Sequence, residues 1–276
     1  MSELHPFEGI LLVSDMDRTL ITEDFKVPQR NIEAIDRFIS KGGRFTLATG
    51  RAASSAAKYL NKVTVNAPAI LSNGASIYDL SAHKIIWNTA LPLSAEEWLQ
   101  KVIERFPDVG AELYIDEGIY IVNSNDWTQH HIVNEGFKFE NTDVKNAPHG
   151  WQKVLFAGEN NRLREVDDFI NATDHEGCDF VFSNEMYYEA LPKDVNKGTA
   201  LARLAGMFGI EHKNTVGIGD YYNDMSLVAM AGIGVAVEGA PKELIDVAKF
   251  VTGPCSNGAV ADLIEYLEKT PGVFGA

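Results

Sequence analysis

The stretch ILLVSDMDRTL (residues 10–20) decides the fold prediction, because an apolar run ends directly in a turn that carries two acidic residues. The run from Ile10 to Ser14 is rich in leucine and β-branched residues, which predicts a short buried strand. A helical pattern starts at Pro28, a residue suited to the first turn of a helix. Its apolar residues share one face: Ile32, Ile35, Phe38 and Ile39. The sequence therefore opens with a strand, an acidic loop and a helix.

The same order of strand and helix recurs on both sides of a central region. The expected elements are strands at 45–48, 69–71, 215–218 and 234–237, with helices at 52–60, at 197–208 and after Asn223. Further helix and strand elements extend to Leu267. Strands that alternate with helices predict a parallel sheet with helices on both faces, so the expected fold class is α/β with a Rossmann-like core.

The central region has a different pattern, in which helices mix with paired strands. An amphipathic helix is expected from Glu96 to Phe106, and a hairpin from Leu113 to Val122 that turns at residues 116–118. The other elements expected here are a helix near Trp127, a strand at 153–157, a helix at 161–170 and strands around Phe180 and Tyr188. Antiparallel pairs among helices predict an α+β module inserted into the parallel domain.

The composition limits the partners that the protein can have. The chain has 276 residues, enough for two packed domains, and 45% of them are hydrophobic. With 24 basic and 39 acidic side chains the formal net charge is -15, which disfavours nucleic acid and anionic membrane surfaces. A site for a phosphorylated ligand must therefore supply its own cations. No obligate protein partner is inferred.

Targeting signals and cysteine usage bear on the location of the protein. Residues 1–9 do not form a basic and then apolar leader, and the sequence has no apolar run of bilayer-spanning length. Cys178 and Cys255 lie far apart and in no metal-binding spacing, so we interpret them as small core residues in a reducing compartment. A cytoplasmic location is expected.

Asp15 and Asp17 follow the first strand, at the edge of a parallel sheet where such folds bind ligands. Two carboxylates at positions i and i+2 of a tight turn can face one cavity. Together with a substrate phosphate they offer the oxygen ligands that Mg²⁺ prefers. Taken alone, so short a motif favours a solvated acidic turn, and the other motifs of the chain must decide between the two interpretations.

The next two strands also end in polar residues. Thr49, Gly50 and Arg51 offer a hydroxyl, exposed backbone N–H groups and a guanidinium, which are three kinds of phosphate ligand. A threonine N-cap followed by a glycine turn explains the same residues equally well. The third strand leads to Asn73 and Gly74, which we expect to contact the substrate or to support the first loop.

Two motifs later in the chain have compatible chemistry. Lys197 opens a predicted helix and can neutralise both a phosphate and a carboxylate nucleophile. Asp220 and Asp224 follow a predicted buried strand and can complete a metal shell. A surface lysine and an acidic helix start are the alternative interpretations. Because all four motifs stand at strand ends, the functional interpretation becomes the better one.

With these motifs in place, the sequence resembles the haloacid dehalogenase (HAD) superfamily, specifically its Cof-type, sugar-phosphatase-like branch with a C2-type cap. The resemblance covers the whole chain and rests on Asp15 with Asp17, on Thr49 to Arg51, on Lys197, and on Gly219-Asp220 through Asn223-Asp224. It implies a core of residues 1–82 and 192–276 and an inserted α+β cap of residues 83–191 that determines substrate specificity. The linkers are expected near residues 79–82 and 192–196.

The resemblance implies a Mg²⁺-dependent phosphatase that hydrolyses small phosphomonoesters, with sugar phosphates as the favoured class. Asp15 would form an aspartyl-phosphate, and Asp17 would act as general acid and base. The expected catalytic residues are Asp15, Asp17, Thr49 and Lys197; the expected substrate-binding residues are Gly50, Arg51, Asn73, Gly74 and Asn223; the expected metal ligands are Asp15, the Asp17 carbonyl and Asp220, with Asp224 orienting the metal's water shell or Lys197.

Two rival functions stay open. A phosphomutase needs the same two aspartates, so Asp17 does not separate it from a phosphatase. A catalytically silent sugar-phosphate sensor could use the cap as a ligand-operated switch, but it would not require a nucleophile at Asp15.

Two further positions carry expectations of their own. Arg18 stands where the family more often has glycine, so its φ is expected to be negative. We favour an outward Arg18 side chain paired with a surface acid over an additional anion-binding group. His130 and His131 lack metal-ligand spacing, and we interpret them as part of a solvated helix face.

Overall fold

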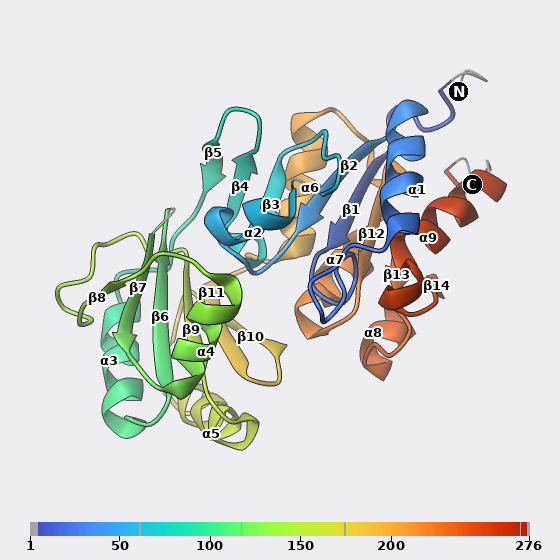
Figure 1. The fold of residues 1–276 in the computed structure, drawn as a ribbon. Coiled ribbons are helices and arrows are strands. Elements are labelled where there is room, and N and C mark those ends of the chain that lie inside the picture. Colours follow the sequence, from blue (N-terminus) through green and yellow to red (C-terminus); the bar gives the residue numbers. More distant parts are fainter. Residues whose placement is uncertain (1–4, 61, 117, 174, 271, 275–276) are drawn as a thin grey trace.

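The structure, a computed structural model, describes residues 5–60, 62–116, 118–173, 175–270 and 272–274. It contains an eight-stranded sheet and a six-stranded sheet, each packed against helices of its own (Figure 1). The expected α/β core with an inserted α+β module is confirmed. Among the described residues, no helix combines the length and the apolar character that a membrane crossing requires.

The larger sheet forms the core. Its strands, in spatial order, are β14 (Phe250–Val251), β13 (Ile233–Ala236), β12 (Thr215–Gly219), β1 (Leu11–Asp15), β2 (Arg44–Ala48), β3 (Ala69–Leu71), β4 (Ser76–Asp79) and β5 (Lys84–Asn88). Neighbours from β14 to β3 pair in parallel, whereas β4 and β5 add an antiparallel hairpin. The ends of β12, β1, β2 and β3 therefore meet at one edge of the sheet, where we expected the polar motifs.

Successive side chains of β1 point to opposite faces of the core sheet, and their packing partners show which helices cover each face. Leu12 packs in one apolar cluster with Phe38 and Leu263, from the helices α1 (Gln29–Ser40) and α9 (Ala259–Lys269). Leu11 packs on the opposite face with Leu201. The remaining core helices are α2 (Ala53–Leu60), on the side of α1, and α6 (Lys197–Met207), α7 (Met225–Met230) and α8 (Lys242–Val247). The central strands are therefore covered on both faces, as parallel strands require.

The smaller sheet belongs to the inserted module, the cap. Its strands, in spatial order, are β10 (Cys178–Asn184), β11 (Tyr187–Pro192), β9 (Lys153–Ala157), β6 (Gly110–Ile115), β7 (Gly118–Asn123) and β8 (Glu140–Asn141). Its helices are α3 (Ala95–Arg105), α4 (Asp126–Glu135) and α5 (Asn160–Asn171). The paired strands and helices expected for the central region are all present.

The two faces of the cap sheet differ in chemistry. On one face, apolar side chains of β6, β9 and β11 pack in a cluster with α3 and α5. On the other face, Glu112, Leu155 and Glu189 lie opposite one another across three adjacent strands, with Tyr114 and Lys153 paired one step along. These five side chains are buried although three of them are charged. We call this side the polar face of the cap.

The chain passes between core and cap beside the turn at residues 72–75. Strand β5 belongs to the core sheet although residues 83–88 were expected in the cap, so we propose that the cap begins near Thr89. The Thr89 N–H donates to the Ala75 carbonyl at 3.0 Å. At the return crossing, Gly74 lies so close to Asn196 that an added Cβ would be 2.3 Å from its carbonyl oxygen. One short turn thus contacts both crossing segments.

Candidate active site

A cavity of about 440 Å³ is lined by residues of both the core and the cap. Its core lining includes most of the residues expected at the site, namely Asp15, Asp17, Thr49, Gly50, Arg51, Asp220, Asn223 and Asp224. The structure describes all of the expected residues. Three of them do not line the cavity: Lys197, Asn73 and Gly74. The polar face of the cap supplies Tyr114, Lys153, Leu155 and Glu189 to the cavity.

Lys197 lies between two aspartates at the bottom of the site. Its Nζ is 2.5 Å from Asp15 Oδ1 and 2.6 Å from Asp224 Oδ1, and the side chain is fully buried. The lysine is held there because Asn196 caps α6: its side chain accepts from the Thr199 N–H at 2.9 Å, and the Thr199 hydroxyl accepts from the Asn196 N–H. Lys197 therefore stands on the rigid first turn of a helix.

Burial and mutual repulsion set the protonation of this cluster. Burial raises the pKa of Asp15 well above its usual range, and Asp224 adds to the shift, while Lys197 opposes it. Burial and Asp224 likewise raise the pKa of Asp220 to about 7. Burial alone would lower the pKa of Lys197, but Asp15 and Asp224 outweigh it and raise that pKa, so the lysine stays charged. The three aspartates and one lysine carry a net negative charge, so a bound cation would reduce the repulsion among the carboxylates.

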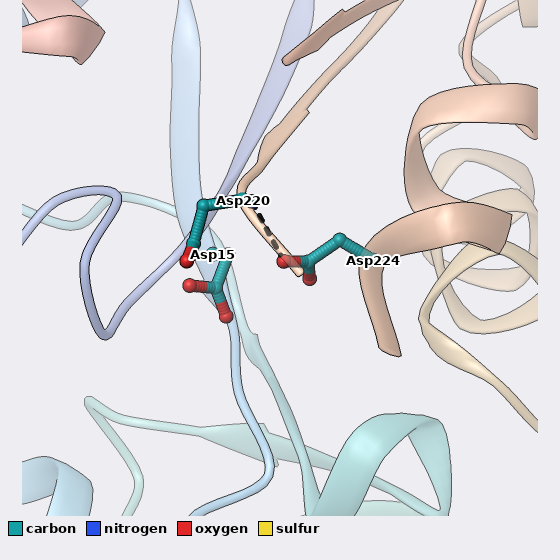
Figure 2. Close-up of side chains that lie close together, drawn as sticks. All are labelled: Asp15, Asp220 and Asp224. Atoms are coloured by element: carbon teal, nitrogen blue, oxygen red, sulfur yellow. Dashed lines mark hydrogen bonds between the residues drawn. The ribbon is translucent and has the colours of Figure 1, made fainter. Parts of the chain in front are cut away.

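The carboxylates of Asp15, Asp220 and Asp224 approach one another from three positions of the core (Figure 2). One oxygen from each lies within 4.8 Å of the others. Asp224 Oδ2 accepts the Asp220 N–H at 3.0 Å and the Tyr221 N–H at 3.2 Å, so both Asp224 oxygens already have protein partners. A buried set of oxygen donors with excess negative charge fits a hard divalent cation such as Mg²⁺.

Asp220 itself is fixed by the loop that follows β1. The Thr19 hydroxyl donates to Asp220 Oδ1 at 2.9 Å, and both side chains are buried. The carboxylate that follows β12 is thus tied to the loop that follows β1, as expected from adjacent strands whose ends meet at one edge.

Asp17 and Arg51 form a two-pronged ion pair. Arg51 Nε and one terminal nitrogen each donate to a different Asp17 oxygen, both at 2.7 Å. The other terminal nitrogen donates to Ser55 at 2.8 Å and lies 3.1 Å from Glu135 of the cap. Arg51 lines the cavity and its guanidinium contacts these three side chains, while its expected role in substrate binding stays a prediction.

The loop after β2 is braced from the cap. Thr49 is buried, and its hydroxyl accepts the Arg51 N–H at 3.2 Å. Lys153 Nζ donates to the Gly50 carbonyl at 2.8 Å and lies 2.9 Å from Glu189. Thr49 and Gly50 both line the cavity, and a hydroxyl and a backbone N–H are groups that can bind a phosphate.

The turn after β3 links three parts of the site. Asn73 adopts φ 53°, donates to Glu189 Oε2 of the cap at 2.8 Å, and accepts from Asn223 at 3.1 Å. Gly74 has φ 106° and packs against the backbone of Asn196. These contacts of Asn73 and Gly74 reach the cap, Asn223 and Asn196 rather than the first loop, and their expected contact with substrate stays a prediction.

Arg18 differs from the expectation, because its φ is 62° rather than negative. The turn compels this conformation: the Arg18 N–H donates to the Ile21 carbonyl at 2.7 Å, and the Ile21 N–H donates to the Met16 carbonyl at 2.8 Å. The half-exposed side chain lies 3.9 Å from the surface acid Glu23, as favoured, but also 3.6 Å from Asp220. Arg18 therefore contacts the acidic cluster as well as the surface.

His131 also differs from the expectation, because it is buried and lines the cavity. Its Nδ1 lies 2.9 Å from Glu112 and its Nε2 3.2 Å from Glu135. Burial alone would lower the pKa of His131, but the two carboxylates outweigh burial and raise it to about 10. The pattern of α4 is weakly amphipathic, so the sequence did not reveal which side of this helix faces inward.

The charged residues of the cap that reach the site were not among the residues expected from the sequence. Glu112 and Glu189 each stand inside a mostly apolar strand, and Lys153 is the first residue of one. A lone charge inside an apolar strand is the signal that could have found them, because such a residue is either paired or functional when buried.

A Rossmann-like core whose acidic strand ends lie beneath an inserted cap defines a class of capped α/β proteins with a carboxylate site. Within this class, the chain belongs to the haloacid dehalogenase-like hydrolase family, whose model matches residues 12–264. The superfamily expected from the sequence is confirmed.

Several relatives are similar over nearly the whole chain. The HMP-PP phosphatase of Cronobacter sakazakii is 28% identical over 257 residues, 91% of this chain and 93% of that protein. The HMP-PP phosphatase of Serratia proteamaculans is 28% identical over 268 residues, 95% of this chain and 96% of that protein. Among solved structures, the HAD subclass IIB sugar phosphatase BT4131 has a TM-score of 0.82 at 20% identity, covering 94% of this chain and 99% of that one. The last similarity shows a shared fold.

Proposed function

We propose that this protein is a Mg²⁺-dependent phosphatase that hydrolyses small phosphomonoesters through an aspartyl-phosphate on Asp15. The observation that carries the proposal is the Asp15 carboxylate, which contacts Lys197 and borders a cavity shared with Asp17. The names of the relatives, HMP-PP phosphatase and sugar phosphatase, support this type of reaction.

In the first half of the proposed reaction, an Asp15 oxygen attacks phosphorus and the bond from phosphorus to the ester oxygen breaks. Asp17 gives its proton to the leaving oxygen, and to do so it must be protonated on an oxygen that accepts from Arg51 in the structure. In the second half, Asp17 takes a proton from water, the water oxygen bonds to phosphorus, and the bond from phosphorus to Asp15 breaks. Inorganic phosphate leaves and both aspartates return to their starting forms.

The surrounding residues would reduce the repulsion between an anionic nucleophile and an anionic ester. Lys197 would act through Asp15, whose charge it partly neutralises from behind the cavity lining, while Thr49 and the Gly50 backbone N–H offer hydrogen-bond donors. Mg²⁺, held by Asp15, the Asp17 carbonyl and Asp220, would supply Lewis-acid stabilisation of the transferring phosphoryl group. Asp224 would keep Lys197 in place through the contact already described.

We propose a small phosphorylated metabolite as the substrate, with sugar phosphates as the favoured class. The cavity of about 440 Å³ has room for a phosphate with a leaving group of monosaccharide size. The cap side of the cavity includes Tyr114, His131 and Glu189, and so polar a lining favours a polar leaving group over a purely apolar one.

The test is phosphate release from a panel of phosphomonoesters, with and without Mg²⁺, for wild type, Asp15→Asn and Asp168→Asn. We expect turnover that needs Mg²⁺ and that falls by roughly 10³-fold or more in Asp15→Asn, because the nucleophile is lost. Asp168 is an exposed cap aspartate, so Asp168→Asn should retain full activity.

The outcomes separate the rival functions. Equal turnover by Asp15→Asn would rule out the covalent mechanism. Transfer of phosphate to a second sugar hydroxyl, in place of release to water, would point to a phosphomutase. Ligand binding without turnover of any ester would point to a sensor.

A further inference from the structure

A chain of alternating charges crosses from the cap to the proposed proton donor. Glu112, His131 and Glu135 belong to the cap, and Arg51 and Asp17 belong to the core. Glu135 Oε1 is 3.1 Å from Arg51 and 3.2 Å from His131 Nε2, so it joins the two halves of the chain. His131 is cationic at neutral pH because its pKa is raised to about 10 by its two glutamates, against the effect of burial. We call these five residues the charge chain.

Four members of the charge chain are buried and Asp17 is not. The Arg51 side chain is 7% exposed, whereas the Asp17 side chain is 42% exposed. Among the described residues, Arg51 supplies both hydrogen bonds to the Asp17 carboxylate. The orientation of Asp17 therefore depends on Arg51, because a half-exposed carboxylate has little packing of its own.

Arg51 in turn is held from two sides. Ser55 of α2 is its support within the core, and Glu135 is its support from the cap. Glu135 is the last residue of α4, and its backbone carbonyl accepts a hydrogen bond from Lys58 of α2. The same helix end thus contacts the core through both its backbone and its side chain, which fixes Glu135 relative to Arg51.

We propose that Glu135 is a positioning residue that orients Asp17 through Arg51, so that proton transfer depends on α4 lying against the core. The inference rests on the proposed function, in which Asp17 protonates the leaving group. It adds that the cap contributes to the chemical step as well as to substrate selection, through a residue that need not touch the substrate.

Two esters with different leaving groups distinguish a positioning role of Glu135 from a purely structural one. An alkyl phosphate releases a strongly basic alkoxide and needs the Asp17 proton, whereas p-nitrophenyl phosphate releases a stable phenolate and needs little help. The ratio kcat/KM reports on the first phosphoryl transfer, before the shared aspartyl-phosphate is hydrolysed. A misdirected Asp17 should therefore impair the alkyl ester selectively.

The experiment compares kcat/KM for a hexose phosphate and for p-nitrophenyl phosphate in wild type, Glu135→Gln and Glu140→Gln. We expect Glu135→Gln to lose roughly 10- to 100-fold on the hexose phosphate and less than about 3-fold on the aryl ester. Glu140 is an exposed glutamate of the same cap, so Glu140→Gln should match wild type on both. Activity on the aryl ester also shows that the variant is folded.

Arg51→Lys provides a second route if Glu135→Gln does not fold. It keeps the positive charge but cannot make the two-pronged contact with Asp17, so it should show the same selective loss. Equal losses on both esters, or no loss on either, in an active enzyme would overturn this inference alone. A wild type that hydrolyses neither ester would overturn the proposed function and this inference with it.

Discussion

His131 is a buried imidazolium whose charge depends on two glutamates, and this makes the stability of the protein dependent on pH. Its pKa is raised from 6.5 to about 10 in the folded state, where Glu112 and Glu135 outweigh burial. A group whose pKa is higher in the folded state stabilises the fold below its unfolded pKa, and that contribution is lost as the pH rises through the folded pKa. The window here runs from about pH 6.5 to about pH 10.

We therefore expect the difference in unfolding free energy between wild type and His131→Gln to be largest near pH 6 and to shrink towards pH 10. Its full size should be on the order of 5 kcal/mol, because each unit of the rise in pKa from 6.5 to about 10 corresponds to about 1.4 kcal/mol. Urea unfolding at pH 6, 8 and 10 measures it. His130→Gln, at the exposed neighbouring position, is the control, and its unfolding free energy should depend on pH in the same way as that of wild type. A constant difference for His131→Gln would contradict the charged state.

The contrast between Asp15 and His131 shows which residues the sequence could predict. Asp15 follows a strand within a local motif, and the rule that ligands bind at the carboxyl ends of parallel strands places it without any knowledge of distant contacts. His131 meets its partner Glu112, 19 positions away, only where α4 lies against β6 in the folded cap. Pairings of that kind depend on strand register and helix rotation, which no local pattern encodes.

At the scale of single elements, the position of α6 depends on the turn that follows β3. Gly74 is suited to this turn in two respects, its φ of 106° and the close approach of the Asn196 backbone. Asn196 caps α6 and precedes Lys197, so a displacement there moves the cation away from Asp15. The glycine thus helps to define the site although it does not line the cavity.

Gly74→Ala should lower the unfolding free energy by about 2–4 kcal/mol, because the Cβ would meet the Asn196 carbonyl and the backbone would be strained. Phosphatase activity should fall with it. The control is Gly206→Ala within α6, where an added Cβ meets nothing within 4 Å; it should stabilise by up to about 1 kcal/mol. Chemical denaturation of both variants decides the point, and shifts of the same sign would refute the role given to Gly74.

Strand and helix assignments followed from the sequence wherever local pattern and fold agreed. The hairpin β4–β5 was not among the expected strands: Ile77 and Trp87 pair across it, so it extends the core sheet into the range expected for the cap. An antiparallel hairpin looks the same in sequence whether it joins one sheet or the other. Only the hydrogen bonds between β3 and β4 assign it to the core.

At the scale of the whole molecule, core and cap share buried polar contacts. Lys153 and Glu189 form an ion pair 2.9 Å apart on the polar face of the cap, with side chains 1% and 2% exposed. Each also contacts the core: Lys153 donates to the Gly50 carbonyl, and Glu189 accepts from Asn73. Removal of either partner leaves the other charge buried and unpaired.

Lys153→Met and Glu189→Gln should therefore each cost about 3–5 kcal/mol of unfolding free energy, whereas the double variant should cost less than the sum by at least about 1 kcal/mol. A double-mutant cycle by chemical denaturation measures this coupling. The matched cycle uses Lys101→Met and Glu97→Gln, an exposed pair on α3 at 2.8 Å, whose coupling should be close to zero. Equal coupling in the two cycles would argue against a special role for the buried pair.

The turn that contacts both crossing segments, through Ala75 to Thr89 and through Gly74 to Asn196, has a consequence for how such proteins diversify. The chain leaves and re-enters the core at neighbouring points, so the loss or exchange of everything between them would require only a short join. Recombination could replace the whole cap with an unrelated module and leave Asp15 and Lys197 in place. New substrate ranges could then arise by transplantation, without any renewed assembly of the reactive centre.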